Sequence, residues 1–412
     1  MRLLLGSDHY PPFIGGAHIQ TRLIAQELAA RGHQVAVATP WHRGFPAVEQ
    51  DGPVAVHRLR ELRTVATRRV PAGVQQHHPP YADPVVAGQL RRLVRGFAPD
   101  VVHAHGWINY SCAAALAGSD VPLVISARDY AYGCPKRTLL FGRGEVCSGP
   151  APRKCAGCAS AHYGRAKGLV ATAGVLGSRP LLRARTAGLH SVSTYVEHIA
   201  GRDAHLVPPV RRVIPEAVPA PGPLTDAVAA DLARLPAEPF MLFVGALRHE
   251  KGTEELLEAY TRLRDAPPLV LVGTIMPDTP ARFPPGVEVL TDFSHDAVLR
   301  AWERALFGVF PSLLPEPLGT VVCEAMTQGR AVVGTRPGGH VDVIEDGVSG
   351  LLVDQGDADG LTVALQRLID DPEGRGRMGE AARVRGEAFR IGTVVSGFEA
   401  LYREVLEADG VE

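Results

Sequence analysis

The sequence lacks an excess of charge of either sign, and it lacks long hydrophobic runs. Its 43 Lys and Arg residues stand against 44 Asp and Glu residues, so the formal net charge of −1 gives no indication of nucleic-acid binding. The longest apolar runs are too short to span a bilayer. The apolar start, residues 1–6, is too short for a signal-peptide core and is better explained as a buried strand. We therefore expect a cytoplasmic protein, with a peripheral position at the inner membrane face left open.

Lysine is also scarce, because almost all basic residues are arginine. Lysines occur only at positions 136, 154, 167 and 251. Such a skew usually reflects genome composition, but it draws attention to Lys251, the only lysine in the second half of the chain.

Composition and periodicity predict the fold class. The 412 residues, 46% hydrophobic and 21% charged, are typical of a soluble protein with two domains. Short β-branched runs alternate with segments of helical period, which indicates an α/β fold with parallel sheets. We predict strands near residues 2–6, 34–39, 54–59, 100–105, 122–128, 211–215, 240–246, 269–273, 287–290, 307–311, 331–335 and 350–353. Both halves share this rhythm, so we predict two doubly wound, Rossmann-like domains facing each other across a cleft.

The proline-rich segment around residues 208–239 predicts the domain boundary. We expect one domain over residues 1–215, a linker over 216–238 and a second domain over 239–389. The last helix, within about 390–412, is free to pack back on the first domain.

A glycine-containing string follows the strand predicted at 307–311. It begins with Glu316 and Pro317, continues through Gly319, and reaches a second carboxylate at Glu324. Pro317 suits the first turn of a helix, and Gly319 lets a ligand approach the backbone closely. The amides of such a helix start bind anions, at the strand ends where doubly wound domains hold ligands.

Helix geometry would place Glu324 about two turns along the same side as Glu316. One carboxylate would then meet a sugar hydroxyl and the other a ribose, with a diphosphate near the amides between them. The alternative is that both are solvated surface acids. The whole string and its spacing favour a sugar-nucleotide site.

A cationic loop precedes the helix predicted at 253–264. It carries Arg248 and Lys251, which would stabilise a leaving nucleoside diphosphate beside a helix start. A solvated loop is the alternative. A further glycine pair, Gly338 and Gly339, either passes close to a phosphate or simply makes a turn.

The first half offers weaker signals. Gly15 and Gly16 follow the first strand but do not form a G-x-G-x-x-G string, which disfavours a nicotinamide enzyme. His103 and His105 point the same way from one strand, and His105 is nearer its carboxyl end. We predict His105 as a site residue, against the alternative of a hydrogen-bonded core histidine. Asp129, after the next strand, is a candidate to orient an acceptor hydroxyl.

Together these strings resemble the retaining glycosyltransferases of family 4, the glycogen-synthase and phosphatidylinositol-mannosyltransferase type, which have the GT-B fold. The resemblance covers nearly the whole chain, and the Glu316 to Glu324 string is its most specific part. It also includes Tyr10-Pro11-Pro12, Arg31-Gly32-His33-Gln34-Val35, Val244-Gly245, Lys251-Gly252, Pro311-Ser312 and Asp346-Gly347.

The resemblance implies transfer of a sugar from a nucleotide sugar to a hydroxyl acceptor with retained anomeric configuration and no catalytic metal. His105 would lie near the donor sugar, Glu316 would hold sugar hydroxyls, Glu324 the ribose and Lys251 the diphosphate. The predicted catalytic residues are therefore His105, Glu316, Lys251 and Arg248. The donor-binding set would be Gly16, Gly245, Leu318, Gly319, Thr320, Val321 and Glu324, and the acceptor-side residues would be Gly15 and Asp129. One departure is Ala246, where family members often carry Arg, so Arg248 either takes over that role or diphosphate binding is weaker.

Four of the six cysteines fall within one insertion at about 130–165. Four thiols so close in an intracellular enzyme suggest a structural zinc site, with disulfides, a redox role or unlinked thiols as alternatives. The predicted ligands are Cys134, Cys147, Cys155 and Cys158. The lysines in or beside the insertion would either help to receive an anionic acceptor or, as we favour, form a solubilising surface.

A basic stretch comprises Arg58, Arg60, Arg63, Arg68 and Arg69. It would contact a membrane or a lipid phosphate, or form a solvated loop, which is the commoner outcome.

Two other functions remain open from the sequence. One is a nucleotide-sugar epimerase on the same fold, and the other is a catalytically inactive sugar-nucleotide-binding protein. The sequence indicates no nucleic-acid partner. It leaves open the donor sugar, the oligomeric state and the acceptor, which could be a polysaccharide, a lipid or a natural-product intermediate.

Overall fold

The structure is a computed structural model of residues 1–412, and it describes all of them except 13–15, 68–77, 143, 409, 411 and 412. The chain divides into two compact units. The first comprises Met1–Gly142, Cys147–Pro215 and Ile391–Glu412, and the second comprises Arg143–Val146 and Glu216–Arg390. The chain therefore crosses from the first unit to the second near residue 215 and returns near residue 391.

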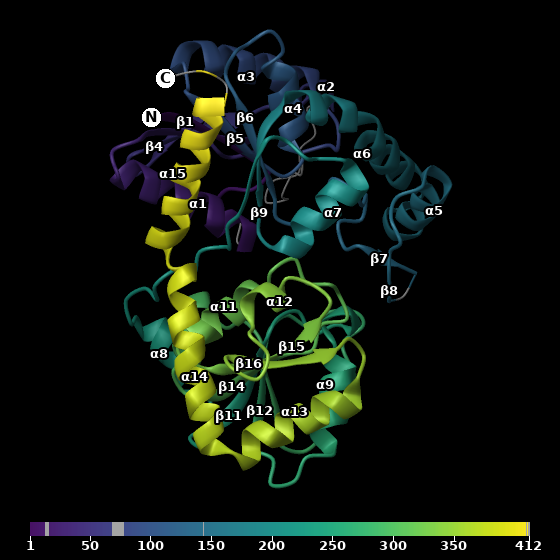
Figure 1. The fold of residues 1–412 in the computed structure, drawn as a ribbon, viewed down its shortest axis with the longest axis vertical. Helices are drawn as coiled ribbons and strands as arrows, with labels where there is room; N and C mark the ends of the chain where they lie inside the picture. The colour runs from purple at the N-terminus through teal and green to yellow at the C-terminus, as the bar shows by residue number, and fades with distance from the viewer. Residues whose placement is uncertain (13–15, 68–77, 143, 409, 411–412) are drawn as a thin grey trace. The chain divides into compact units, whose positions relative to one another are not determined.

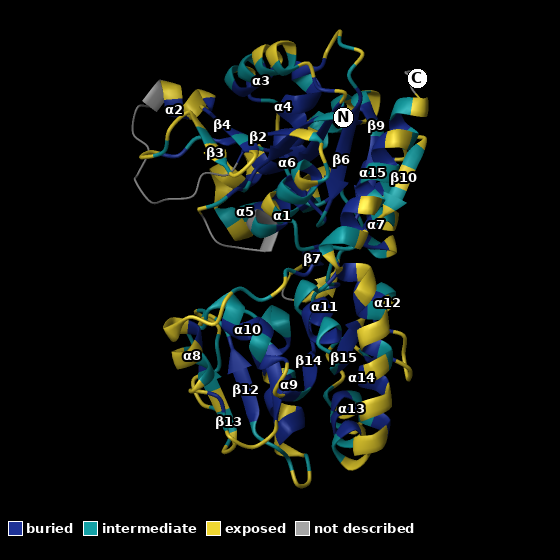
Figure 2. Ribbon diagram, turned by 90° about the vertical axis from the view of Figure 1, so that its left-hand side faces the viewer, coloured by how far each residue is buried: buried dark blue, intermediate teal, exposed yellow. Residues whose placement is uncertain are grey.

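The first unit is built on an eight-stranded sheet in the order β10-β9-β6-β5-β1-β2-β4-β3. Neighbouring strands run parallel except β3 and β4, which are antiparallel. The strands are β1 (Arg2–Ser7), β2 (Gln34–Pro40), β3 (Val48–Asp51), β4 (Val54–Leu59), β5 (Val101–His105), β6 (Leu123–Ala127), β9 (Thr186–Ser191) and β10 (Val210–Val213). Every residue of β5 and β6 is buried, as expected for central strands covered on both faces (Figure 2). The strand order turns at β1, where doubly wound folds bind ligands.

Helices cover this sheet on both sides (Figure 1). The helices of the first unit are α1 (Gly16–Ala30), α2 (Leu62–Thr67), α3 (Pro84–Phe97), α4 (Ile108–Ala115), α5 (Pro152–Tyr163), α6 (Arg165–Arg185), α7 (Thr194–Ala204) and α15 (Ile391–Ala408). Asp83 shows why α3 starts where it does, since its carboxylate accepts hydrogen bonds from the amides of Val85 and Val86. Two short strands, β7 (Leu140–Phe141) and β8 (Glu145–Val146), pair separately.

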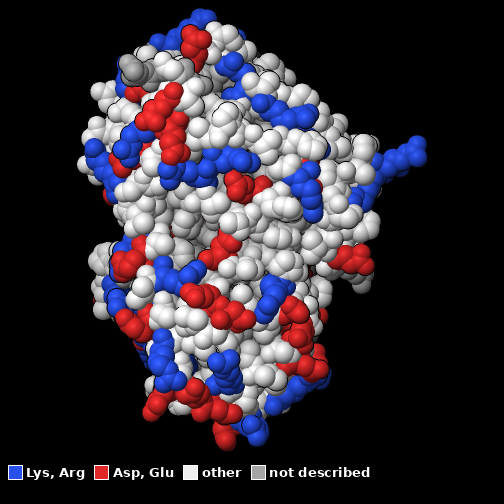
Figure 3. All heavy atoms as spheres, in the orientation of Figure 1, with Lys and Arg blue, Asp and Glu red and all other residues white. Residues whose placement is uncertain are grey.

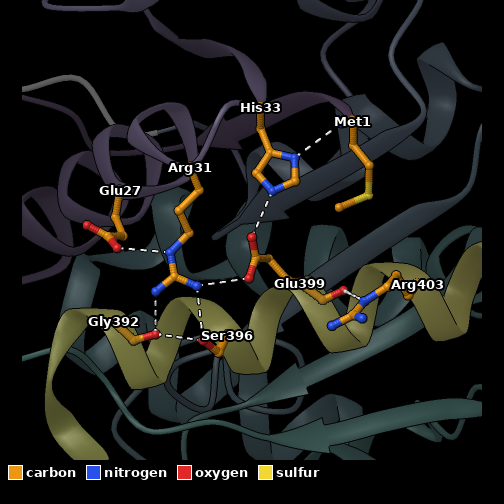
Figure 4. Close-up of polar contacts among 8 residues, drawn as sticks. All are labelled: Met1, Glu27, Arg31, His33, Gly392, Ser396, Glu399 and Arg403. Atoms are coloured by element: carbon orange, nitrogen blue, oxygen red, sulfur yellow. Dashed lines mark hydrogen bonds and ion pairs between the residues drawn. The ribbon is translucent and has the colours of Figure 1, made fainter.

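Helix α15 is fastened to the first unit by a polar cluster (Figure 4). Arg31 donates to Glu399, at 2.9 Å, and to the Gly392 carbonyl oxygen, at 2.6 Å. His33 bonds the other oxygen of Glu399 at 2.9 Å. The chain's last helix therefore rests on the turn after α1, far away in sequence.

The second unit contains a six-stranded sheet, parallel throughout, in the order β13-β12-β11-β14-β15-β16. Its strands are β11 (Phe240–Val244), β12 (Leu269–Val272), β13 (Val287–Leu290), β14 (Ala305–Phe310), β15 (Ala331–Arg336) and β16 (Gly350–Asp354). Its helices are α8 (Asp226–Leu232), α9 (Thr253–Thr261), α10 (His295–Ala301), α11 (Thr320–Thr327), α12 (His340–Val343), α13 (Ala358–Asp370) and α14 (Pro372–Gly386), with 3₁₀ turns at His249–Lys251 and Glu387–Phe389. One core cluster joins β11, β14 and β15 to α9 and α13.

These two sheets confirm the predicted α/β class with two Rossmann-like, doubly wound sheets. The strand β9 was not predicted, nor were the short strands β3, β7 and β8. The segment expected as a linker, residues 216–238, lies in the second unit and contains α8. No helix in the described part of the chain is both long and apolar enough to span a membrane.

Candidate functional site

Lys251 and Glu316 form an ion pair at the carboxyl end of the second sheet. Lys251 Nζ lies 2.6 Å from Glu316 Oε1, and the hydroxyl of Ser312, just after β14, donates to the same oxygen at 2.7 Å. Burial alone would raise the pKa of Glu316, but the charge of Lys251, the nearby His340 and the two hydrogen bonds together hold it below its ordinary value. The site thus holds an ionised, oriented carboxylate beside a partly exposed ammonium group.

Glycines let the loops after β14 and β15 pack backbone against backbone. The Gly339 amide donates to the Glu316 carbonyl oxygen at 2.6 Å. A Cβ atom on Gly339 would lie 2.2 Å from the Pro317 carbonyl oxygen, and one on Gly338 would lie 2.7 Å from the Glu316 nitrogen. Both distances are too short for any side chain, so this glycine pair positions the Glu316 loop.

Helix α11 starts at Thr320, three residues later than the sequence predicted. Gly319 is its N-cap, with a left-handed φ of 86°, and no side-chain hydrogen bond from the described residues caps the helix start. A residue with this conformation cannot continue a helix backwards, so Pro317 and Glu316 lie in the preceding loop. The prediction that Glu316 and Glu324 share one helix face was therefore wrong. Uncapped amides at the start of α11 still face outward from a helix N-terminus, which favours an anion.

Glu324 is a buried carboxylate with one oxygen unused. Its Oε1 lies 2.9 Å from His295 Nε2, while its Oε2 has no hydrogen-bond partner among the described residues. The side chain is only 4% exposed. A buried carboxylate oxygen without a hydrogen-bond partner is costly, so this atom is suited to accept from a ligand hydroxyl. His295, from the start of α10, was not found by sequence reasoning.

Arg248 does not join the Lys251 and Glu316 pair. Its guanidinium contacts Glu250 at 3.1 Å and Asp278 at 3.9 Å. Gly245, which directly follows β11, donates its amide to the Val272 carbonyl oxygen at 3.0 Å. The structure therefore brings Lys251 and Glu316 together and leaves Arg248 engaged with Glu250 of its own loop and with Asp278 of the loop after β12.

The first unit places two histidines side by side. His103 is the hydrogen-bonded core histidine, bound to Ser126 and Tyr402. The side chain of His105 is buried as well, yet neither of its ring nitrogens has a partner among the described residues. Burial lowers the pKa of His105 far below its ordinary value, and the nearby Arg128 lowers it further, so its ring is neutral. It can therefore both donate and accept a hydrogen bond.

A carboxylate missed from the sequence lies near the end of β1. Asp8 accepts hydrogen bonds from the amides of Trp107 and Ile108, at 2.7 Å each, and so caps the start of α4. Burial raises its pKa to about 7, against the opposing effects of Arg137 and of these amides. Its position directly after an apolar strand was the available signal.

The other acceptor-side predictions fare differently. Asp129 accepts two hydrogen bonds from Arg137, at 2.8 and 2.6 Å, and one from the Ala131 amide at 2.8 Å. It is thus engaged in a local turn. Gly16 begins α1, and Gly15 lies outside the described residues.

The predicted zinc site is not supported. Cys134, Cys147, Cys155 and Cys158 line one small cavity, and all are free thiols. Among the described residues, no group of three or more His, Cys, Asp or Glu side chains is placed to hold a metal ion. Two thiols instead point to backbone oxygens, Cys147 to Gly149 at 3.5 Å and Cys158 to Leu140 at 3.9 Å. Burial raises the pKa of the Cys134 and Cys155 thiols above the ordinary value.

The arginines of the basic stretch that the structure describes contact other groups of the protein. Arg58 is buried, pairs with Glu49 and donates to the Pro11 carbonyl oxygen. Arg63 pairs with Glu61 at 2.6 Å, Arg60 lies over the Trp41 ring, and Arg68 and Arg69 lie outside the described residues. On the face drawn in Figure 3, acidic and basic side chains are interspersed. These contacts favour a structural role for the stretch over membrane contact.

Comparison with known proteins matches both units. Residues 229–385 match the family described as glycosyl transferases group 1, and residues 14–143 match glycosyltransferase family 4. Glycogen synthase of Mycobacterium tuberculosis is 26% identical over 93% of this chain and 90% of its own length. D-inositol 3-phosphate glycosyltransferase of Arthrobacter sp. is 27% identical over 91% of this chain and 86% of its own length.

Solved structures agree on the fold. Sucrose-phosphate synthase from Thermosynechococcus elongatus superposes with a TM-score of 0.70 at 20% identity, covering 99% of this chain and 100% of that one. Anabaena HepE in complex with UDP-glucose gives 0.66 at 16% identity, covering 99% and 100%. The chain therefore belongs to the glycosyltransferases of the GT-B fold and is of the family 4 type.

Proposed function

We propose that this glycosyltransferase moves a sugar from a nucleotide-sugar donor to a hydroxyl acceptor with retention of anomeric configuration. One observation carries the proposal: Lys251 forms an ion pair with Glu316, and Glu316 lies on the loop that leads into the uncapped start of α11. A cation, an oriented carboxylate and free amides are the groups that a sugar diphosphate requires.

In this proposal each group has a separate ligand. Glu316 accepts from hydroxyls of the donor sugar, and the amides after Gly319 bind a phosphate. The ammonium group of Lys251 stabilises the negative charge of the diphosphate. This stabilisation matters most when the bond between the diphosphate and the sugar breaks. The unused Oε2 of Glu324 accepts from a ribose hydroxyl. The neutral ring of His105 forms a hydrogen bond with the donor sugar in this proposal.

The proposed reaction follows from the family resemblance. The bond between the anomeric carbon and the diphosphate oxygen breaks, and the acceptor oxygen bonds the same carbon from the same face. The acceptor proton goes to the released diphosphate oxygen. Lys251 and the amides of α11 stabilise the leaving charge in this scheme, so we propose that catalysis requires no divalent metal.

The acceptor class stays a broad proposal. Relatives bear names as different as alpha-maltose-1-phosphate synthase and alpha-D-kanosaminyltransferase. We propose a hydroxyl acceptor among polysaccharide, lipid or natural-product intermediates, and a cytoplasmic place of action.

The test has two stages. A panel of UDP-, ADP- and GDP-sugars is screened by thermal shift, since a ligand at 100 times its Kd stabilises by about 2.7 kcal/mol. The best donor is then incubated without acceptor, and ¹H NMR follows the first sugar released. An α-configured donor should give the α-sugar before mutarotation. Initial release of the β-sugar would contradict retention, and tight donor binding without turnover on any acceptor would contradict transfer.

A further inference from the structure

A continuous row of buried hydrogen bonds runs beneath His105. Tyr402, on α15, lies 2.7 Å from His103 Nδ1, and His103 Nε2 lies 2.8 Å from Ser126 Oγ. Ser126 Oγ lies 2.7 Å from His190 Nδ1, and His190 Nε2 lies 2.8 Å from the Ile214 carbonyl oxygen. Every side chain in this row is at most 2% exposed. The row starts on the helix that returns to the first unit and ends next to Pro215, where the chain leaves it.

Its end at Ile214 fixes the direction of every bond. A carbonyl oxygen only accepts, so His190 carries its proton on Nε2, and its Nδ1 is an acceptor while the ring is neutral. The Ser126 hydroxyl must then donate its single proton to His190 Nδ1. Its oxygen is therefore the acceptor of the hydrogen bond from His103 Nε2. By the same logic His103 carries its proton on Nε2 and takes a hydrogen bond from the Tyr402 hydroxyl at Nδ1. One arrangement of protons satisfies all the bonds.

Burial keeps both rings neutral. It lowers the pKa of His190 to about 3 and that of His103 far below the ordinary value, and Arg128 adds to both effects. The aromatic ring of Phe398, one turn before Tyr402 on α15, lies 5.4 Å from the His103 ring and 4.7 Å from the His190 ring between centroids. Helix α15 therefore covers both rings with apolar surface and supplies the one hydroxyl that His103 needs.

His103 in turn supports His105. Their ring centroids are 4.2 Å apart, and the ring planes make an angle of 42°. Neither ring nitrogen of His105 has a hydrogen-bond partner among the described residues. The orientation of the His105 ring thus depends on its packing against the His103 ring, which two hydrogen bonds hold in one orientation. Without the Tyr402 hydroxyl, the buried Nδ1 of His103 would be an unsatisfied acceptor, and the bond to Ser126 would be the one remaining hydrogen bond on the ring among the described residues.

We propose that Tyr402 is a positioning residue for the transfer reaction, acting through His103 on the ring of His105. The inference rests on the proposed function, because His105 matters only if it bonds the donor sugar. It assigns the last helix a part in the reaction that its position in the sequence does not suggest. Tyr402 itself does not touch the substrate.

The proton arrangement is tested by ¹⁵N NMR of the full-length protein with labelled histidine, which distinguishes protonated from unprotonated ring nitrogens. The expected result is the neutral Nε2–H form for both His103 and His190, assigned with His103→Gln and His190→Gln variants. In Tyr402→Phe, the Nδ1 signal of His103 should move to that of an acceptor without a donor. An Nδ1–H form or an imidazolium at either residue would overturn the proposal.

The positioning role is tested by kinetics with the best donor. In Tyr402→Phe, kcat/KM for donor turnover should fall about tenfold, as for the loss of one buried hydrogen bond partner. The Kd for the nucleoside diphosphate alone should stay unchanged, because that ligand is assigned to residues of the second unit. The matched control is Tyr110→Phe, since Tyr110 is equally buried but its hydroxyl has no partner among the described residues.

The outcomes separate this inference from the proposed function. Absence of turnover in the wild-type protein would contradict the transferase itself. Equal kcat/KM in wild type and Tyr402→Phe, with turnover present, would overturn the positioning role alone. An equal loss in Tyr110→Phe would also overturn it, because the effect would then follow from any change in the packing of buried tyrosines.

Discussion

Lys251 Nζ lies 2.6 Å from Glu316 Oε1, although the two residues are 65 positions apart in the sequence. One comes from the turn before α9 and the other from the loop before α11. The contact therefore joins two strand ends of one sheet, where GT-B enzymes of this type are expected to hold the donor.

The charge of Glu316 should be essential for turnover. In Glu316→Gln the side chain keeps its size but loses the charge paired with Lys251, and its hydrogen bonds to sugar hydroxyls weaken. We expect kcat to fall by roughly 10²-fold or more. The control is Glu303→Gln, an exposed residue of the same unit, which should leave steady-state kinetics unchanged. Near-normal kcat in Glu316→Gln would remove this carboxylate from the reaction.

The unused oxygen of Glu324 should serve nucleotide binding. Glu324→Gln replaces a buried carboxylate by an amide, so the bond to a ribose hydroxyl loses its charge assistance. We expect the Kd for the nucleoside diphosphate, measured by calorimetry, to rise about tenfold. The parallel measurement is the matching 2′,3′-dideoxynucleoside diphosphate, which lacks the bonded hydroxyls. If wild type and variant discriminate equally between the two ligands, Glu324 does not contact the ribose.

Gly319 should tolerate no side chain. A Cβ atom there would lie 2.6 Å from His340 Nε2, on a backbone with φ of 86°. Gly347 has a similar φ of 77° but nothing within 4 Å of the added atom. Gly347→Ala should therefore cost about 1 kcal/mol of unfolding free energy through backbone strain alone. Gly319→Ala should cost clearly more and weaken donor binding, and equal costs in urea denaturation would show that the His340 contact is unimportant.

The bond between His295 and Glu324 predicts a dependence of stability on pH. That hydrogen bond raises the pKa of His295 above its ordinary 6.5, against a smaller opposing effect of burial. The folded protein thus binds this proton more tightly than the unfolded chain does. The stabilisation is fully present below pH 6.5 and is lost as the pH rises through the raised, folded-state pKa.

Urea denaturation of wild type and His295→Gln across this range isolates the effect. The difference in unfolding free energy between the two proteins should be largest below pH 6.5 and should shrink at higher pH. A difference that is constant or grows with pH would mean that His295 is neutral in the folded protein.

Local patterns predicted much of this fold and part of the site. The buried strand ends, the Glu316 to Glu324 string and the two histidines of β5 could be found because each lies within one strand, turn or short segment. The residue at which α11 begins, directly after Gly319, could also have been predicted, because a glycine cap ends helical geometry on its N-terminal side. Pro317 instead led us to predict an earlier helix start. The left-handed conformation of Gly319 sets the actual start at Thr320.

Contacts between distant segments could not be predicted in this way. His295 meets Glu324 across 29 positions, and Lys251 meets Glu316 across 65 positions, because segments far apart in sequence are neighbours in the second unit. Strand β9 was missed because Gly188, His190 and Ser191 weaken its strand pattern. The structure explains this composition: a Cβ at position 188 would lie 2.6 Å from Val405 on α15, and His190 belongs to the buried row that ends at Ile214.

The cysteines show the limit of spacing as a guide. Four thiols within one insertion come together around a single cavity, but their orientation decides whether they can bind metal. Here two thiols point to backbone oxygens. Side-chain direction of this kind depends on loop conformation, which the spacing alone does not determine.

The most direct test of the account is donor turnover without acceptor in Lys251→Ala. Wild-type protein with its best nucleotide sugar should release nucleoside diphosphate slowly, and Lys251→Ala should release it at least 10²-fold more slowly because the leaving charge loses its cation. Lys167→Ala removes an exposed lysine on α6 and should match wild type. Undiminished release by Lys251→Ala would contradict the assignment of the ion pair of Lys251 and Glu316 to the donor diphosphate and sugar.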